Sequence, residues 1–135
     1  MPGKIKDALP PKALSLFSGA GGMDIGVKQV GFDILACVEF DPYACETLRT
    51  NISQEHLHTK VFEEDVRKID PAVMMKDLGL KAGELDLLCG GPPCQAYSLV
   101  GRSRDPNRMK GDKRNFLFRY YAQFLIRYKP KFVVF

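Results

Sequence analysis

A cysteine that follows two prolines is the residue best placed for covalent chemistry in this sequence. Cys94 stands in the segment Gly-Gly-Pro-Pro-Cys-Gln-Ala-Tyr-Ser, residues 90–98. Two prolines fix two φ angles and remove two backbone donors, so the chain entering Cys94 is stiff and presents the thiol in one direction. Cys37, Cys45 and Cys89 stand in strand or helix patterns, where a buried apolar role is usual. The four cysteines lack metal-ligand spacing and the density of a disulfide scaffold, so we expect free thiols and no metal site.

A glycine-rich turn provides a candidate ligand site. Residues 17–22 read Phe-Ser-Gly-Ala-Gly-Gly and follow an apolar stretch that predicts a strand. Glycines there let the backbone approach a ligand, although such turns also serve tight packing. Glu39 lies 20 residues after Gly19, where a carboxylate can accept hydrogen bonds from both hydroxyls of a ribose. The turn and the carboxylate together predict a nucleoside site.

The residues around this turn favour S-adenosylmethionine over a nicotinamide. Asp24 stands where a dinucleotide fingerprint would have its third glycine. S-adenosylmethionine has no pyrophosphate but carries a sulfonium cation, which suits the ring face of Phe17 and nearby acidic side chains. Phe40 is a candidate cover for the adenine and Asp65 a candidate acceptor for its amino group. From the residues alone, core packing of Phe40 and helix capping by Asp65 are the more common roles.

The elements that must position these residues alternate between strand-like and helix-like patterns, which predicts an α/β domain with a mostly parallel sheet. The glycine turn, Glu39 and the turn into Cys94 each follow a predicted strand. They therefore fall at the carboxyl edge of the sheet, where open α/β folds bind ligands. The expected strands are 13–17, 33–38, 61–62, 85–88 and 131–135, and the expected helices are 23–30, 42–51, a short one from 71, and 116–128.

Two helix starts and one apolar stripe support this assignment. Asp41-Pro42 and Asp70-Pro71 each supply an N-cap and a first-turn proline. Apolar side chains in the last helix recur at helical spacing and predict a stripe that faces the core. These side chains are Phe116, Leu117, Tyr120, Tyr121, Phe124, Leu125 and Tyr128.

Composition and charge limit the function classes. The chain has 135 residues, 45% of them hydrophobic and 27% charged, which is typical of one globular domain. No apolar run reaches the roughly 20 residues of a membrane span, and the first residues lack the pattern of a secretory signal. We therefore expect a cytoplasmic protein with no membrane partner. Between Arg102 and Arg114, six basic residues face two acidic ones, which fits either a contact with nucleic acid or a solvated loop.

Taken together, the motifs resemble the cytosine-C5 DNA methyltransferase family. The proline-cysteine-glutamine signature is specific to that family, whereas the glycine turn is shared by many methyltransferases. The resemblance covers nearly the whole chain. It rests on residues 16–22, on Glu39 followed by an aromatic residue, on Asp65, on residues 91–95 with Ser98, on residues 114–117 and on residues 129–131.

This resemblance implies a Rossmann-like, S-adenosylmethionine-dependent methyltransferase fold over residues 1–135, incomplete at its carboxyl end. It implies Cys94 as the catalytic nucleophile. It implies cofactor contacts from Phe17, Ser18, Gly19, Ala20, Gly21, Gly22, Glu39, Phe40, Asp65, Val66 and Pro92, and DNA contacts from Gln95, Ser98 and Arg102.

The chemistry implied by the family explains the need for a thiol. A Cys94 thiolate adds to C6 of a cytosine flipped out of double-stranded DNA, and C5 then takes the methyl group. Residues 97–114 form a segment too long for a routine connection, with Gly101 and Gly111 as candidate hinges, so we expect it to close over DNA. The resemblance further implies a bacterial, DNA-associated restriction–modification context.

The family's next signature, Glu-Asn-Val, would fall beyond Phe135, and the target-recognition region is also not in the sequence. We therefore expect the amino-terminal part of an enzyme, either truncated or naturally split with a complementary carboxyl-terminal subunit, and inactive alone. Three other readings stay open: a non-catalytic cofactor-binding or assembly subunit, an RNA cytosine-5 methyltransferase and, more distantly, a nicotinamide oxidoreductase.

Overall fold

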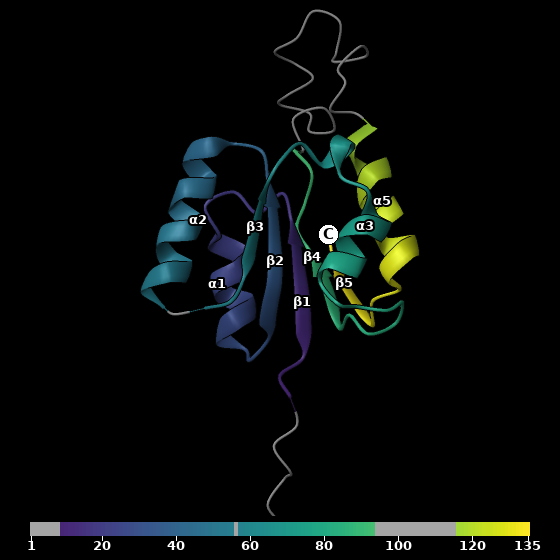
Figure 1. The fold of residues 1–135 in the computed structure, drawn as a ribbon, viewed down its shortest axis with the longest axis horizontal. Coiled ribbons are helices and arrows are strands. Elements are labelled where there is room, and N and C mark those ends of the chain that lie inside the picture. The colour runs from purple at the N-terminus through teal and green to yellow at the C-terminus, as the bar shows by residue number, and fades with distance from the viewer. Residues whose placement is uncertain (1–8, 56, 94–115) are drawn as a thin grey trace, which may run out of the picture.

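A five-stranded parallel sheet lies at the centre of the molecule (Figure 1). The computed structural model describes residues 9–55, 57–93 and 116–135. The strand order is β3-β2-β1-β4-β5, and every neighbouring pair is parallel, so the prediction of an α/β domain with a mostly parallel sheet is confirmed. The strands are β1 (Lys12–Leu16), β2 (Asp33–Glu39), β3 (Lys60–Glu63), β4 (Leu87–Cys89) and β5 (Phe132–Val134).

Helices cover both faces of the sheet, with α1 and α2 on one side and α3 and α5 on the other (Figure 1). Both predicted N-caps are confirmed, because Asp41 accepts a hydrogen bond from Ala44 N at 2.9 Å and Asp70 one from Ala72 N at 2.7 Å. In the described ranges, no helix has the length and apolar character needed to cross a membrane. The helices are α1 (Gly22–Gln29), α2 (Pro42–Gln54), the 3₁₀ turn η1 (Val66–Lys68), α3 (Pro71–Asp77) and α5 (Leu117–Tyr128).

Side chains that alternate along the strands build a separate core on each face of the sheet. Leu14, Leu16 and Leu88 point toward α3 and α5 and are fully buried there. Ala13 and Leu87, on the opposite face, pack with side chains of α1 and α2. The three-layer arrangement therefore follows from strands that are apolar on both faces.

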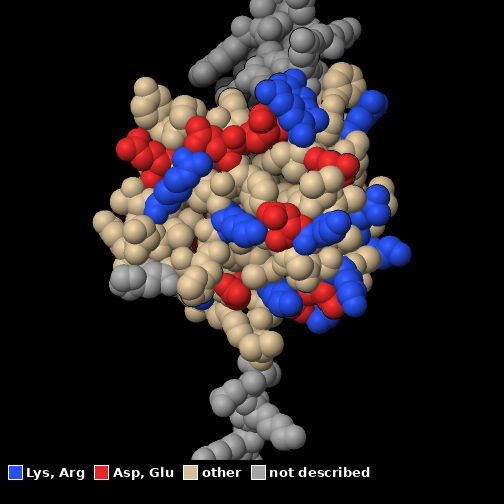
Figure 2. All heavy atoms as spheres, in the orientation of Figure 1, with Lys and Arg blue, Asp and Glu red and all other residues tan. Residues whose placement is uncertain are grey.

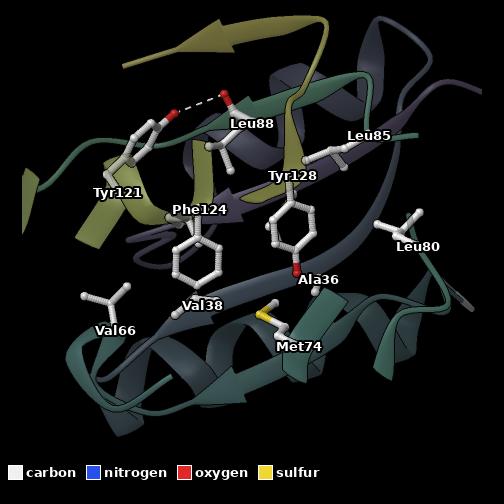
Figure 3. Close-up of a cluster of buried hydrophobic side chains, with 12 residues drawn as sticks. Ala36, Val38, Val66, Met74, Leu80, Leu85, Leu88, Tyr121, Phe124 and Tyr128 are labelled. Atoms are coloured by element: carbon white, nitrogen blue, oxygen red, sulfur yellow. Dashed lines mark hydrogen bonds between the residues drawn. The ribbon is translucent and has the colours of Figure 1, made fainter. Parts of the chain in front are cut away.

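The helix α5 closes the first of these cores with aromatic side chains (Figure 3). Tyr121, Phe124 and Tyr128 are buried, and the Tyr121 hydroxyl donates to the Leu88 carbonyl at 3.1 Å. The predicted stripe is too wide, since Phe116 and Leu125 are 47% and 37% exposed. Successive helical residues are about 100° apart, so these two positions lie on the flanks of the line through the buried residues.

The exit of β4 approaches the end of β1 so closely that only glycine fits. Gly90 has a φ of 117°, and a Cβ built on it would lie 1.7 Å from the Leu16 carbonyl oxygen. Its backbone N–H donates to Val134 O at 3.1 Å, which holds the peptide between β1 and β5. The start of the segment that leads to residue 94 is therefore fixed by backbone packing.

Replacing Gly90 by alanine should destabilise the fold by about 3 kcal/mol or more, because a methyl group would meet a carbonyl oxygen and the φ value would be strained. Urea unfolding of the two proteins measures the difference. Gly91→Ala is the matched control, since a Cβ at Gly91 meets nothing within 4 Å. Equal stability of both variants would contradict the close approach at Gly90.

A buried carboxyl group lies between α1 and the sheet. Asp24 is 7% exposed, its Oδ2 atom lies 3.7 Å from Cys37 Sγ, and its Oδ1 atom has no hydrogen-bond partner within the described part of the chain. Burial raises the pKa of Asp24 above its ordinary value of 3.8. Asp24 is thus part of the packing under the first turn of α1.

Replacing Asp24 by asparagine should change the pH dependence of stability. From the ordinary pKa of 3.8 up to the raised folded-state pKa, unfolding of the native protein releases a proton, so its stability should fall as the pH rises. The asparagine variant releases no such proton, so its free energy of unfolding should rise relative to that of the native protein across this pH range. Urea unfolding at several pH values measures both curves, and parallel curves would show that Asp24 is not the source.

Candidate cofactor and catalytic site

A cavity of about 430 Å³ opens at the carboxyl ends of the strands. Its wall includes Phe17, Glu39, Phe40, Asp65 and Val66, all of which the sequence predicts as cofactor contacts. The volume lies in the range of small-molecule sites, roughly 300 to 1,000 Å³. The cavity therefore brings together residues that are far apart in the chain and belong to the ends of three neighbouring strands.

The turn after β1 begins with a strained residue. Phe17 has a φ of 55°, an uncommon value for a side chain of this size. Ser18 N donates to Val38 O at 3.2 Å, Ser18 Oγ to Ser15 Oγ at 2.9 Å, and Gly21 N to Ser18 O at 3.0 Å. These bonds fix the turn and leave the Phe17 ring on the cavity wall.

The Glu39 carboxylate ties this turn to the end of β2. Its Oε2 atom accepts from Gly19 N at 2.7 Å, and its Oε1 atom accepts from Phe40 N and Asp41 N, both at 2.9 Å. Glu39 is only 8% exposed. A carboxylate has about four acceptor positions, so three backbone donors leave room for about one more. The role of Glu39 toward two ribose hydroxyls stays a prediction, and a ribose would share this carboxylate with the backbone.

Asp65 both caps η1 and lines the cavity, so the two roles considered for it are compatible. It accepts from Arg67 N at 2.9 Å, as an N-cap does. Its two carboxylate oxygens each lie 2.9 Å from Arg67 Nε, and Arg67 Nη2 also contacts Oδ2. The Arg67 guanidinium lowers the pKa of Asp65 and keeps it ionised.

Acidic side chains dominate the charge around the cavity. Figure 2 shows a row of them near the end of the molecule where the strands finish. The described wall contains Glu39, Glu64 and Asp65 against the single cation Arg67. This excess of negative charge favours a cationic ligand and disfavours a polyanion at the same place. The residues present therefore fit S-adenosylmethionine, whose sulfonium is a cation.

Other predicted cofactor residues lie beside the cavity without forming its wall. Ala20 and Gly21 line a smaller cavity of about 180 Å³ between α1 and α2, and Gly22 begins α1. Ser18 and Gly19 act through the backbone bonds described above, and Pro92 stands between two wall residues, Gly91 and Pro93. Whether these six residues contact a cofactor stays a prediction.

Several wall residues were not predicted from the sequence. Arg67 had a detectable signal, because a basic residue two positions after an N-capping aspartate can return to its carboxylate. Leu117 had no such sequence signal, because it follows a long segment and no local pattern predicts that it lines the cavity. The residues missed are Val38, Glu64, Arg67, Gly91, Pro93 and Leu117.

The three described cysteines are structural. Cys37, Cys45 and Cys89 are buried and free, and burial raises the pKa of all three, that of Cys89 to about 11. Their thiols are therefore neutral at neutral pH, which confirms their interpretation as packing residues. Among the described residues, no group of His, Cys, Asp or Glu side chains is arranged to hold a metal ion.

The predicted nucleophile and the predicted DNA contacts cannot be placed in the same way. Cys94, Gln95, Ser98 and Arg102 lie outside the described residues, as do the candidate hinges Gly101 and Gly111. The described chain ends its approach to them at Pro93, on the cavity wall.

Replacing Glu39 by glutamine should loosen the turn and weaken cofactor binding. Glutamine has one acceptor oxygen, so either the Gly19 N–H or the Phe40 and Asp41 N–H groups would face an NH₂ group. We expect a loss of about 1 to 3 kcal/mol in urea unfolding and weaker binding of S-adenosylhomocysteine in calorimetry. Glu63→Gln, which removes a charge that pairs with Arg49 on the surface, should change neither quantity appreciably. Native-like behaviour of Glu39→Gln would refute the structural tie.

Comparisons with known proteins identify the family of this chain. The family model of the C-5 cytosine-specific DNA methylases matches residues 12–135. The type II methyltransferase M.AquIA of a Picosynechococcus strain is 46% identical over 91 residues, covering 67% of this chain and 35% of the relative. M.XorII of Xanthomonas oryzae pv. oryzae, also a type II methyltransferase, is 33% identical over 129 residues, covering 93% and 27%.

Solved structures of methyltransferases are also similar to this chain. A protein described as a DNA modification methyltransferase encoded within an E. coli prophage superimposes with a TM-score of 0.71 at 28% identity, covering 91% of this chain and 30% of its own. The bifunctional kinase–methyltransferase WbdD shares the fold alone, with a TM-score of 0.52 at 15% identity, covering 87% and 22%. The chain thus spans between about a fifth and about a third of the length of these proteins. Since the family model matches nearly all of its residues, the chain belongs to the C-5 cytosine-specific DNA methylases.

Proposed function

We propose that this chain carries the cofactor-binding and nucleophile-bearing part of a DNA (cytosine-5-)-methyltransferase that uses S-adenosylmethionine. The observation that carries the proposal is the composition of the cavity wall. Glu39 and Asp65 lie on it with Phe17, and Pro93, the residue directly before Cys94, lies on the same wall. A methyl donor in this cavity would therefore lie close to where the chain delivers its candidate nucleophile.

The described residues have distinct roles toward the cofactor. Bound S-adenosylmethionine supplies a methyl group on a positively charged sulfur. Glu39 would accept from a ribose hydroxyl with its remaining acceptor position, and Asp65 would accept from the adenine amino group. The Phe17 ring and the acidic wall would stabilise the sulfonium. The cavity wall also contains Phe40 and Val66, which offer apolar surface to the adenine ring.

Cys94 is the residue that we propose as nucleophile. The other three cysteines are buried thiols with raised pKa values, so none of them offers a thiolate. The Cys94 thiolate would form a bond to C6 of the cytosine, and the ring electrons would make C5 nucleophilic toward the methyl carbon. Loss of the C5 proton to a base and expulsion of the sulfur would then restore the aromatic ring and the free thiolate.

Double-stranded DNA is the proposed partner. A target cytosine must leave the base stack to reach a thiol and a methyl donor in the cavity. The basic residues between Arg102 and Arg114 carry the charge needed for phosphate contacts, and we assign Gln95, Ser98 and Arg102 to the DNA. The acidic cavity wall complements this arrangement, because it leaves the cofactor cavity unattractive to the phosphate backbone.

The whole reaction needs regions that relatives have beyond the matched part. The chain corresponds to 35% of M.AquIA and 27% of M.XorII. We propose that the remaining family regions, in the same polypeptide or in a second one, provide sequence recognition and complete the catalytic site. Without them, binding of the cofactor is the expected activity of this chain.

The test separates cofactor binding from chemistry with the variant Cys94→Ala. The chain is combined with the remaining family regions, and transfer of labelled methyl groups to DNA is measured together with binding of S-adenosylhomocysteine. Loss of the nucleophile should reduce methylation more than about 1,000-fold and leave binding unchanged. Cys37→Ala, which alters a buried packing thiol, should retain methylation.

Each alternative function gives a different result. Unchanged methylation by Cys94→Ala would refute the nucleophile and favour a cofactor-binding or assembly subunit. Methylation of RNA instead of DNA would identify an RNA cytosine-5 methyltransferase. Binding of NAD that displaces S-adenosylhomocysteine would refute the cofactor and favour an oxidoreductase.

A further inference from the structure

We infer that Arg67 occupies the hydrogen-bond acceptor that the adenine amino group would use, so that cofactor binding replaces the Arg67 guanidinium on Asp65. This inference rests on the proposed cofactor site. It assigns to Arg67 a role in setting the affinity of that site.

The geometry of the pair shows how fully the acceptor is used. Asp65 Oδ1 accepts from the backbone N and from Nε of Arg67, both at 2.9 Å. Asp65 Oδ2 accepts from Nε at 2.9 Å and from Nη2. Arg67 thus supplies three N–H donors to this carboxylate, and because the Nε–H is shared between the two oxygens, each oxygen is contacted twice. An adenine amino group would therefore have to compete with the Arg67 guanidinium for the Asp65 carboxylate.

The two carboxylate oxygens of Asp65 would lose different hydrogen bonds if the adenine amino group replaced a donor of Arg67. The backbone N–H of Arg67 binds only Oδ1, where it caps η1. In the described part of the chain, only the guanidinium binds Oδ2. An exchange at Oδ2 would therefore leave the cap of the 3₁₀ turn intact, and Oδ2 is the oxygen that we assign to the adenine amino group.

The guanidinium is able to leave at modest cost. The Arg67 side chain is 44% exposed, and an ion pair at such a site changes an equilibrium by a factor of a few. Glu64, another residue of the cavity wall, pairs with Lys68 at 3.3 Å and is a second anion toward which the displaced group could turn. Arg67 thus competes with the cofactor without blocking it.

The test uses the full 135-residue chain and the variant Arg67→Met, which keeps an unbranched apolar stem and removes every side-chain donor. Calorimetric titration with S-adenosylhomocysteine should give a Kd about three- to tenfold lower for Arg67→Met than for the native chain. The gain should shrink at high salt, because salt weakens the competing ion pair in the native chain. An unchanged melting temperature confirms that the variant is folded.

The matched control is Arg49→Met. Arg49 forms an exposed ion pair with Glu63 at the end of the neighbouring strand β3, and neither residue belongs to the cavity wall. This variant should bind S-adenosylhomocysteine as the native chain does. An equal gain in both variants would show a general charge effect and overturn the inference.

A second ligand tests the acceptor itself. An analogue of S-adenosylhomocysteine whose purine lacks the 6-amino group makes no bond to Asp65, so Arg67→Met should bind it no better than the native chain does. Equal gains for both ligands, or weaker binding of S-adenosylhomocysteine by Arg67→Met, would overturn the exchange while leaving the cofactor site intact. No binding of S-adenosylhomocysteine to any of these proteins would overturn the cofactor site itself.

Discussion

Two parallel strands end side by side at the cavity, and the Glu39 carboxylate holds their ends together. It accepts from Gly19 N in the turn after β1 and from Phe40 N and Asp41 N at the start of the segment after β2. Without these bonds, three backbone donors near a largely buried position would have no acceptor among the atoms they now contact. The strained φ of Phe17 and the placement of its ring depend on the same turn. The cavity therefore depends on one acidic side chain whose hydrogen bonds are formed without any ligand.

The same pattern recurs at the third strand, with a different outcome. Asp65 also accepts hydrogen bonds from within the chain, but apart from the Arg67 backbone N–H its donors belong to a partly exposed side chain, whereas the donors to Glu39 are backbone N–H groups. The backbone N–H groups cannot leave Glu39 unless the turn unfolds, whereas the Arg67 guanidinium can leave Asp65 by a rotation of its side chain. One carboxylate thus organises the site while the other is available for exchange. A site built this way is assembled in the free protein and keeps one adjustable contact.

Sequence patterns were sufficient for the sheet, the helix starts and the residues at the strand ends, because each depends on neighbours along the chain. Asp41 and Asp70 cap their helices as their Asp-Pro pairs predict, and Glu39 and Asp65 reach one cavity because parallel strands end at one edge. Leu117 joins that wall from beyond residues 94–115, and no local pattern places it. The hydrogen bonds of Glu39 also escape prediction, because a motif identifies a side chain without saying which backbone donors already bind it.

The sheet also keeps the thiols within its strands neutral, which bears on the proposal that Cys94 is the reactive one. Cys37 and Cys89 stand within β2 and β4, where the layers on both faces remove water and raise the pKa of each thiol. At Gly90 the chain leaves the sheet through a space that admits no side chain, and Gly91 and Pro93 then line the cavity. Cys94 follows Pro93 directly in the sequence and stands five positions after Cys89. The backbone contact at Gly90 therefore marks the point where the chain leaves the core that keeps Cys89 neutral and turns toward the cavity, which is what the proposed role of Cys94 requires.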